Sequence, residues 1–447
     1  MKKFILTALI LTLTTAMVFA DNIDSVIKES DISKNATVSV SVRKLKSGNI
    51  VYEKDSHKLM NPASTLKAFT TPVIVEQLGD NYTFKTGVYK FGNNAYIKLS
   101  ADPLFNSKML KGLINSLKDA GLKKPDKIYI DDTVTDDIEY GVGWMWDDEV
   151  SPFIPKISRY NLDGNIFSLT VEPSNDKKSV NIKIPYEYNV SVINKLKFGS
   201  KNNIAVTRNF WDGTEKITLI GTVNAKTDIK VPTFNQKRYF ISVLQDIMNY
   251  SGVTYYGSFD SKQTPDNAVL IKEEITSVNK MYPLIMENSN NLVSETLFKI
   301  AGGKFLNTRG TTYAGIQAFK DYYKHIGLDT DEIVVVDASG VSRNNLLSAD
   351  WMTKALYKTE KNAVNFNYKE RFNIPNRGTM TNRLFDLRDY LWAKTGTLAN
   401  TSGITGYIKT KSGNDLAFAI LIQYTDKSTD EAKKLEDKIL TTIYNKY

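Results

Sequence analysis

The sequence predicts an α/β (α+β) protein in which both ends of the chain build one domain and the middle forms a two-part insert. Residues 38–52 and 403–424 each contain two apolar runs on either side of a Ser-Gly-Asn turn, which is the pattern of a β-hairpin. A capping box at Ser428 and Glu431 then opens a terminal helix with apolar residues at helical spacing. Strand pairs at both ends and a closing helix indicate that the termini share one sheet-and-helix domain.

The middle of the chain has a different pattern. A helix followed by a strand is predicted over 108–133 and again over 236–260, whereas 166–222 gives short alternating runs with almost no helical signal. The predicted organisation is therefore a terminal domain over 21–79 and 266–447, an α/β insert over 80–160 and 223–265, and a nested β-rich piece over 161–222.

The N-terminus predicts export. Two lysines precede an apolar run, and Val18-Phe19-Ala20 is typical of a cleavage site, so residues 1–20 are predicted to be a signal peptide. An uncleaved N-terminal anchor is the alternative. No later apolar run is long enough to span a bilayer, so no transmembrane anchor is expected after cleavage.

Composition argues against several classes of function. The chain has no cysteine, which excludes thiol catalysis, and two histidines, His57 and His325, which are too few for a His-rich metal site and argue against a Ser-His-Asp triad. The net charge of +9 is spread along the chain, which argues against nucleic-acid binding and fits attraction to an anionic envelope. We expect no metal and no cofactor, so an enzyme of this composition needs a general base other than histidine.

A serine and a lysine three residues apart occur at several places. They begin at Ser25, Ser41, Ser64, Ser174 and Ser277. Ser64 differs from the others because a helix-start pattern precedes it and an apolar helical stripe follows. Positions i and i+3 share a helix face, so Ser64 Oγ and Lys67 Nζ can meet. Lysine serves as a base for serine only if its pKa falls, through burial or a neighbouring cation.

A Lys-Thr-Gly motif at 394–396 supplies a second lysine. It follows a strand pattern, and Lys394 offers positive charge that lowers the pKa of Lys67 and attracts a carboxylate. Gly396 is expected to leave room for a substrate backbone beside the strand.

A Ser-Asn-Asn motif at 289–291 supplies further polar groups at the start of a predicted helix. Ser289 is suited to relay a proton, and the Asn291 amide is suited to hold a peptide carbonyl. The middle residue, Asn290, is expected to face away from the substrate.

These three motifs, in this order on helix, helix start and strand, resemble those of class A β-lactamases and penicillin-binding proteins. Over nearly its whole mature length the chain is similar to the D-alanyl-D-alanine carboxypeptidase/endopeptidases among the class C low-molecular-mass penicillin-binding proteins. The segments that carry the likeness are NPASTLKAFTT (61–71), GWMWDDEVSPF (143–153), VVDASGVSRNN (335–345) and WAKTGTLANTSGITGY (392–407). The resemblance implies a penicillin-binding, serine β-lactamase-like transpeptidase domain with an antiparallel sheet and helices, plus a two-part insert.

The resemblance also implies roles for the motif residues. Ser64 attacks the carbonyl between two D-alanines and is acylated, and Lys67 takes its proton. Ser289, with Lys394, passes a proton to the leaving D-alanine. Water then hydrolyses the acyl-enzyme, whereas β-lactams acylate Ser64 and remain there as inhibitors.

Further positions are implied to bind the substrate. Lys394 and Thr395 engage the terminal carboxylate, and the backbone N–H groups of Ser64 and Thr397 form the oxyanion hole. Three more residues match family positions that contact the diamino-acid side chain of the peptidoglycan stem peptide: Asp148 for an ammonium group, Arg343 for a carboxylate, and Phe153. The implied compartment is the periplasm or another extracytoplasmic cell-wall space.

The sequence departs from the family pattern at Pro72, which falls where the nucleophile helix normally continues. Proline removes a backbone hydrogen bond inside a helix, so a kink or a shorter helix is expected.

Two alternative functions stay open. A serine β-lactamase of class A would need a deacylating glutamate, but no Glu-x-x-x-Asn pattern follows Asn291. The later glutamates are expected to be surface or helix charges: Glu295, Glu332, Glu360 and Glu370. A non-catalytic peptidoglycan- or β-lactam-binding protein with a relict site is the other alternative.

Overall fold

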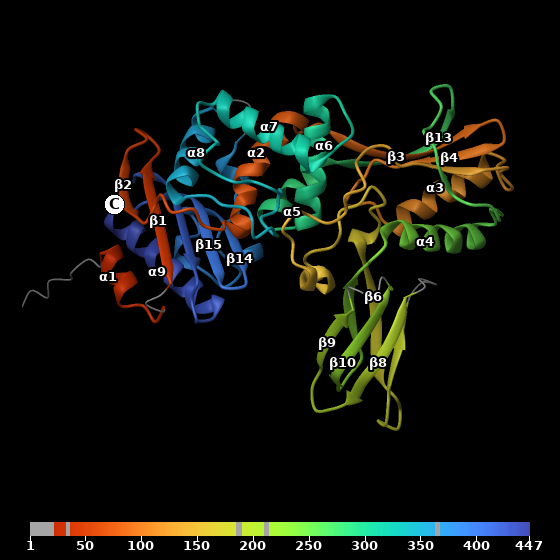
Figure 1. Ribbon diagram of the computed structural model, residues 1–447, viewed down its shortest axis with the longest axis horizontal. Helices are drawn as coiled ribbons and strands as arrows, with labels where there is room; N and C mark the ends of the chain where they lie inside the picture. Colours follow the sequence, from red (N-terminus) through yellow and green to blue (C-terminus); the bar gives the residue numbers. More distant parts are fainter. Residues whose placement is uncertain (1–21, 33–35, 185–189, 210–213, 363–366) are drawn as a thin grey trace, which may run out of the picture.

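The computed structural model describes residues 22–32, 36–184, 190–209, 214–362 and 367–447 (Figure 1). The predicted signal peptide lies outside the described residues. Within these ranges, no helix combines the length and the apolar character needed to cross a membrane.

Both ends of the chain contribute to one antiparallel sheet. Its strands, in spatial order, are β14 (Leu391–Leu398), β15 (Thr401–Lys409), β16 (Asp415–Gln423), β1 (Thr37–Lys44) and β2 (Ile50–Lys54). The predicted N-terminal hairpin is β1 and β2, and the C-terminal pair is β15 and β16. β1 pairs with β16, so the first and last strands of the chain lie side by side at the centre of the sheet.

Helices cover both faces of this sheet (Figure 1). They are α1 (Ile23–Lys28) and α9 (Thr429–Lys446) on one side, and α2 (Lys67–Leu78), α5 (Tyr282–Met286), α6 (Asn291–Leu306), α7 (Thr312–His325) and α8 (Ala349–Asn362) on the other. Along β16, Phe418 and Ile420 point into the core with α9, whereas Ala417 and Ala419 point towards α8 and its neighbours. This is the period-two alternation of a strand buried on both faces. The predicted capping box opens α9.

The nucleophile helix does not end at its proline. α2 continues through Pro72 to Leu78, so the expectation of a shorter helix is wrong. Pro72 has no N–H to donate to the carbonyl of Ala68, four residues earlier. The buried hydroxyl of Tyr368 donates to Ala68 O instead, and Tyr323 Oη donates to Phe69 O at 2.9 Å. The Tyr368 hydroxyl therefore replaces the hydrogen bond that the proline removes, and Tyr323 adds a bond to the next carbonyl along the helix.

The insert contains a second five-stranded sheet. Its strands, in spatial order, are β12 (Asp260–Ser261), β5 (Ile128–Asp131), β4 (Asn94–Lys98), β3 (Thr83–Phe91) and β13 (Val269–Ser277), and helices α3 (Ser107–Asp119) and α4 (Gln236–Ser251) pack on it. β13 pairs with β3, so the sheet extends past the predicted return to the first domain at 266.

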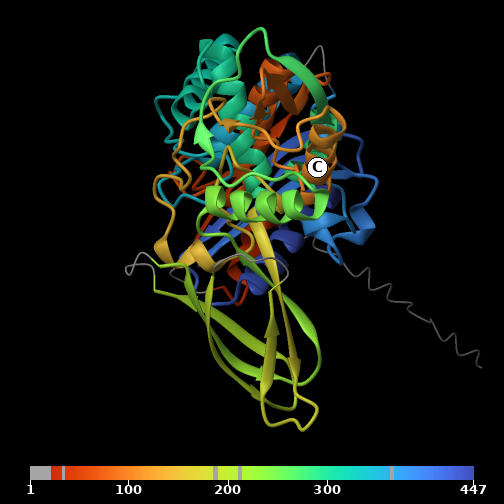
Figure 2. The same cartoon turned by 90° about the vertical axis from the view of Figure 1, so that its right-hand side faces the viewer.

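A lobe of strands projects from the insert, as Figure 2 shows from the side. It has two three-stranded sheets: β8 (Ser191–Phe198), β10 (Lys216–Val223) and β9 (Asn203–Arg208), and then β11 (Thr227–Pro232), β6 (Ile166–Pro173) and β7 (Val180–Lys183). β11 pairs with β6, so the lobe continues past the predicted limit at 222. One apolar cluster runs through the insert and the lobe. The division into domains stays a prediction.

The insert is fastened to α6 by a buried ion pair. Lys299 Nζ donates to Asp136 Oδ1 at 2.7 Å and to Ile138 O at 2.6 Å. Thr135 also forms an isolated parallel bridge with Gly310. These contacts hold residues 135–138 of the insert against the second half of α6 and the turn that follows it.

Candidate active site

Ser64 lies in a tight turn at the start of the nucleophile helix. The turn is the 3₁₀ helix η1 (Ala63–Leu66), which runs directly into α2. Ala63 has a φ of 46°, and Asn61 Oδ1 accepts from its N–H at 2.8 Å. This local hydrogen bond supports a backbone conformation that is rare for a residue with a side chain.

Lys67 donates to three acceptors around its Nζ. They are Ser64 Oγ at 3.0 Å, Asn291 Oδ1 at 2.6 Å and Ser339 O at 2.6 Å. The lysine is 0% exposed. Three segments that are far apart in the sequence therefore converge on one amine.

The Ser-Asn-Asn motif forms the turn before α6. Ser289 takes a left-handed φ of 59°, and the Asn290 side chain caps the helix by accepting from Val293 N. Asn290 therefore serves as the N-cap of α6. Asn291 holds Lys67 with its oxygen, and its Nδ2 donates to Phe153 O at 2.8 Å.

Lys394 is buried in the edge strand β14. Its Nζ donates to Ser289 Oγ and to Thr395 O, both at 2.9 Å. Neighbouring Gly396 packs against the nucleophile turn, since a Cβ there would lie 2.8 Å from Thr65 N and 2.9 Å from Pro62 O. The missing side chain therefore makes room for the protein's own backbone and not, as predicted, for that of a substrate.

Burial dominates the electrostatics of both lysines. It lowers the pKa of Lys67 to about 7, although the charges of Glu295 and Asp337 raise it. Burial, and then the charge of Lys67, lower the pKa of Lys394 well below its usual range. Burial is therefore what makes Lys67 a base near neutral pH, and the charge of the neighbouring lysine acts on Lys394 and not, as predicted, on Lys67.

The remaining residues of the Lys-Thr-Gly strand border the same region. Thr395 Oγ1 donates to Thr379 Oγ1 at 2.6 Å. Thr397 is exposed and pairs in register with Ser402 of β15. Thr379, in η7 (Gly378–Met380), thus adds a hydroxyl beside Thr395.

The three residues predicted to contact a stem-peptide side chain lie on surface segments. Arg343 Nη1 donates to Asp148 Oδ2 at 2.6 Å, so the two charges expected to bind a ligand bind each other. Phe153 is 80% exposed, and only its backbone carbonyl is tied to the centre, through Asn291.

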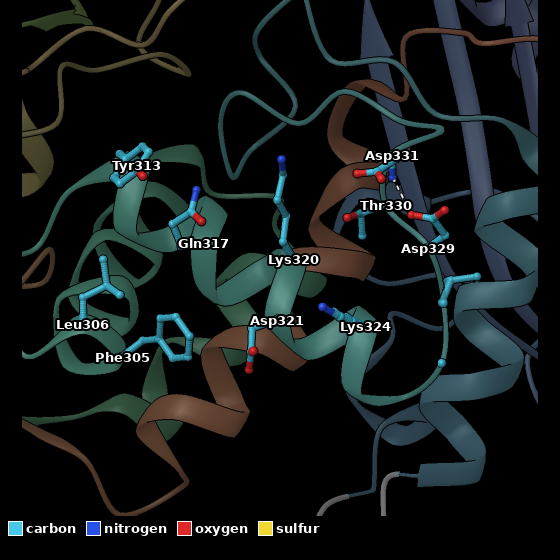
Figure 3. Close-up of a pocket in the computed structure, with 12 residues that line it drawn as sticks. Phe305, Leu306, Tyr313, Gln317, Lys320, Asp321, Lys324, Asp329, Thr330 and Asp331 are labelled. Carbon is cyan, nitrogen blue, oxygen red and sulfur yellow. Dashed lines mark hydrogen bonds between the residues drawn. The ribbon is translucent and has the colours of Figure 1, made fainter.

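Two pockets differ in their relation to these residues. A pocket of about 440 Å³ lies between the insert and the start of α6, and its lining includes Phe153, Ser289 and Asn291. A pocket of about 740 Å³ lies over α7 and the segment after it, lined by lysines, aspartates and Tyr313 (Figure 3). None of the predicted site residues lines this second pocket. We therefore place the chemistry at the residues around Lys67 and Lys394, beside the first pocket.

Sequence reasoning missed three residues of the centre. Glu295 was expected to be a surface or helix charge, but it is 1% exposed and sits one helical turn after Asn291. Ser339 contributes a carbonyl, and Thr379 contributes a hydroxyl. Neither residue belongs to one of the three motifs from which the site was predicted. Glu332 and Glu370 are exposed, as predicted, and so is His325. The His57 side chain is 75% exposed and faces Asp350.

Fold and site together define a serine acyl-transfer enzyme of the penicillin-binding type. The chain belongs to the D-Ala-D-Ala carboxypeptidase 3 (S13) family, whose model matches residues 19–443, and it is a serine-type D-Ala-D-Ala carboxypeptidase. This confirms the family resemblance and the predicted fold class.

Individual relatives are distant in sequence. The chain is 22% identical over 420 residues to the D-alanyl-D-alanine carboxypeptidase DacB of Haemophilus influenzae, covering 88% of this chain and 86% of that protein. It is 23% identical over 435 residues to a D-alanyl-D-alanine carboxypeptidase of an Actinomadura species, covering 90% and 80%. The crystal structure of penicillin-binding protein 4 from Haemophilus influenzae matches with a TM-score of 0.84 at 20% identity, covering 95% of this chain and all of that one.

Proposed function

We propose that this carboxypeptidase acts on peptidoglycan stem peptides through an acyl-enzyme on Ser64. The observation that carries the proposal is the arrangement of acceptors around Lys67. A neutral lysine amine has two N–H bonds and one lone pair. The carbonyl oxygens of Asn291 and Ser339 take the two N–H bonds, so the lone pair is left facing Ser64 Oγ at 3.0 Å.

Acylation follows from that arrangement. Ser64 Oγ bonds to the carbonyl carbon of the penultimate D-alanine while its proton moves to Lys67 Nζ. The C–N bond to the terminal D-alanine then breaks, and Ser289, held by Lys394 at 2.9 Å, donates a proton to the leaving amine and recovers one from the lysines. Water finally cleaves the ester, which frees the shortened peptide and restores the Ser64 hydroxyl.

The oxyanion hole is assigned to the N–H groups of Ser64 and Thr397. The direction of N–H groups alternates along a strand. Ala393 N–H leaves the open edge of β14 to reach Asn373 O at 2.8 Å, so the N–H groups of Thr395 and Thr397 point off that same edge. This supports a role for Thr397 in stabilising the charge that develops on the substrate carbonyl.

The terminal carboxylate of the substrate is assigned to Lys394 and Thr395, with Thr379 beside them. Burial keeps the pKa of Lys394 low in the free protein, and an arriving carboxylate favours its charged form. Substrate binding and protonation of Lys394 are therefore coupled.

Asp148 and Arg343 are assigned to the diamino-acid side chain of the stem peptide. In the free protein they form an ion pair with each other at 2.6 Å. A side chain that carries both an ammonium group and a carboxylate can exchange this pair for two charge-assisted hydrogen bonds. Phe153, exposed in the segment that follows Asp148, would pack against its aliphatic stem.

β-Lactams are proposed to acylate Ser64 and act as inhibitors, and the chain is proposed to work in the periplasm or an equivalent cell-wall space. The Haemophilus influenzae penicillin-binding protein 4, with the same fold, has also been solved in complex with a β-lactam, at a TM-score of 0.78 and 20% identity to this chain. Endopeptidase action on cross-linked stem peptides would use the same acyl-enzyme with a larger leaving group.

The test is release of D-alanine from a peptide that ends in D-Ala-D-Ala. The wild-type protein should release it, and the Ser64→Ala variant should not. Absence of release by wild type would leave the non-catalytic alternative, and rapid turnover of a chromogenic β-lactam would favour the β-lactamase. Cross-linked muropeptides, tested in parallel, measure the endopeptidase share.

A further inference from the structure

Glu295 is a buried acid that the reaction outlined above does not use. It lies one turn after Asn291 on α6. Its Oε1 accepts from the backbone N–H groups of Ala338, at 3.0 Å, and Ser339, at 2.7 Å. A carboxylate is costly to bury unless it is hydrogen-bonded, and here the bonds fix a loop.

The loop that Glu295 holds ends on the proposed base. Both backbone groups of Ser339 are hydrogen-bonded: Glu295 accepts from its N–H, and Lys67 Nζ donates to its carbonyl at 2.6 Å. Without this carbonyl the amine would keep one carbonyl acceptor, that of Asn291. It could then rotate about its Cε–Nζ bond, and the lone pair would no longer point at Ser64.

The same loop is locked against the nucleophile turn. Asp337 Oδ1 accepts from Gly340 N at 2.9 Å, and Gly340 has a φ of 79°. A Cβ on Gly340 would lie 1.9 Å from Ala63 O, so only glycine permits this approach. Thr70 Oγ1 also donates to Ala338 O at 2.9 Å. A shift of the loop would therefore disturb the turn as well as the amine.

Charge links the same groups. The charged neighbours are Asp337 in the loop and Lys67 on α2, and the charge of Lys67 in turn lowers the pKa of Lys394 in β14. Burial and then Asp337 raise the pKa of Glu295 to about 7, while hydrogen bonds from the loop lower it. In turn, Glu295 and Asp337 raise the pKa of Lys67 against its burial. In its charged form Glu295 thus places negative charge close to the amine that gains a proton, and the two groups take up protons over the same pH range near 7.

We propose that Glu295 is a positioning residue for Lys67, fixing the Ser339 carbonyl and supplying negative charge that favours the protonated amine formed when Ser64 attacks. The inference rests on the roles proposed above for Ser64 and Lys67. It assigns Glu295 no contact with the substrate.

The test is the pH dependence of acylation by a fluorescent penicillin. Glu295→Gln keeps an acceptor oxygen but removes the charge, so the acid limb of its rate profile should move about 0.5–1 pH unit lower. Glu295→Asp keeps the charge but cannot reach both N–H groups, so its rate should fall while the midpoint stays. Glu332→Gln removes the same charge at an exposed position and should change neither.

The outcomes separate the inference from the proposed function. A Glu295→Gln profile that superimposes on wild type, or that drops equally at every pH, would overturn the inference. Failure of both Glu295 variants to fold would also overturn it, since Glu295 would then be purely structural. If wild type is not labelled, or if Ser64→Ala is labelled equally, it is the role of Ser64 that fails.

Discussion

The group of residues around Lys67 and Lys394 and the Asp148–Arg343 pair, which we propose to bind the diamino-acid side chain, differ in how far water reaches them. Lys67 and Lys394 are fully buried, whereas the side chains of Asp148 and Arg343 are 19% and 31% exposed. Burial is what lowers the pKa of a lysine enough to make it a base. A recognition site instead needs charges that can change partners quickly, and partly hydrated ion pairs are weak enough to do so. The two regions therefore place charged side chains in opposite environments, buried for the proposed chemistry and partly hydrated for the proposed recognition.

The largest expected effect on the acylation rate comes from replacing Lys67 with a residue that stays positively charged and cannot act as a base. Lys67→Arg should slow acylation by a fluorescent penicillin by about 10²–10⁴-fold, because arginine stays protonated. Stopped-flow fluorescence measures the rate. Lys320→Arg, at an exposed site on α7, is the matched control and should behave as wild type. A Lys67→Arg variant that acylates at the wild-type rate would refute the assignment of the base.

The next effect is on pH. Because burial lowers the pKa of Lys67 to about 7, the amine is increasingly protonated below that pH and has no lone pair to accept from Ser64. The acylation rate of wild type should fall about tenfold per pH unit below pH 7 and level off above it. Melting curves at each pH control for unfolding. A rate that is constant from pH 5 to pH 8 would contradict this role of burial.

A smaller effect is expected in the exposed region. Arg343→Met should lower kcat/KM for a stem peptide with a carboxylate on its diamino acid by about tenfold or more, because one charge-assisted hydrogen bond is lost. Acylation by a penicillin without such a side chain should be unchanged. Asp148→Asn is the companion variant for the ammonium group. Equal losses on both substrates would show that Arg343 supports the centre itself.

The smallest effect on the chemistry is expected from the bond that compensates for Pro72. Tyr368→Phe leaves the buried Ala68 carbonyl without the tyrosine hydroxyl and should cost about 1–3 kcal/mol in the free energy of unfolding. In a Pro72→Ala background the new backbone N–H can reach that carbonyl, so the same change should cost less. Denaturant unfolding of the four proteins of this double-mutant cycle measures the coupling. Equal losses of unfolding free energy in both backgrounds would show that the Tyr368 hydroxyl does not compensate for Pro72.

Local patterns predicted the elements that carry the motifs. The strand pairs at both termini, the capping box of α9 and the start of α6 follow from alternation and cap residues near in sequence. Each of these elements could be predicted because the type of side chain at each position indicates the local structure. The contact of Lys67 with Asn291 was not predicted, because the Asn291 amide was expected to hold a peptide carbonyl of the substrate; in the free protein its nitrogen instead donates to Phe153 O.

The features that sequence missed depend on backbone groups brought in from far away. Ser339 contributes only its carbonyl to Lys67, and any residue has a carbonyl. Glu295 looks like an ordinary helix charge until the loop at 337–340 folds over it. Gly396 was expected to make room for a substrate because the residues next to it in the sequence do not indicate that the nucleophile turn packs against it.

The Asn291 amide bridges the insert and the base with its two different ends. Its oxygen accepts from Lys67, and its nitrogen donates to Phe153 O, on the insert side. An amide rotated by 180° would present N–H groups to an amine that needs an acceptor. The insert thus fixes the orientation of the Asn291 amide through the Phe153 carbonyl. An enzyme shortened by removing the insert would lose this hydrogen bond, and the Asn291 oxygen would no longer be held towards Lys67.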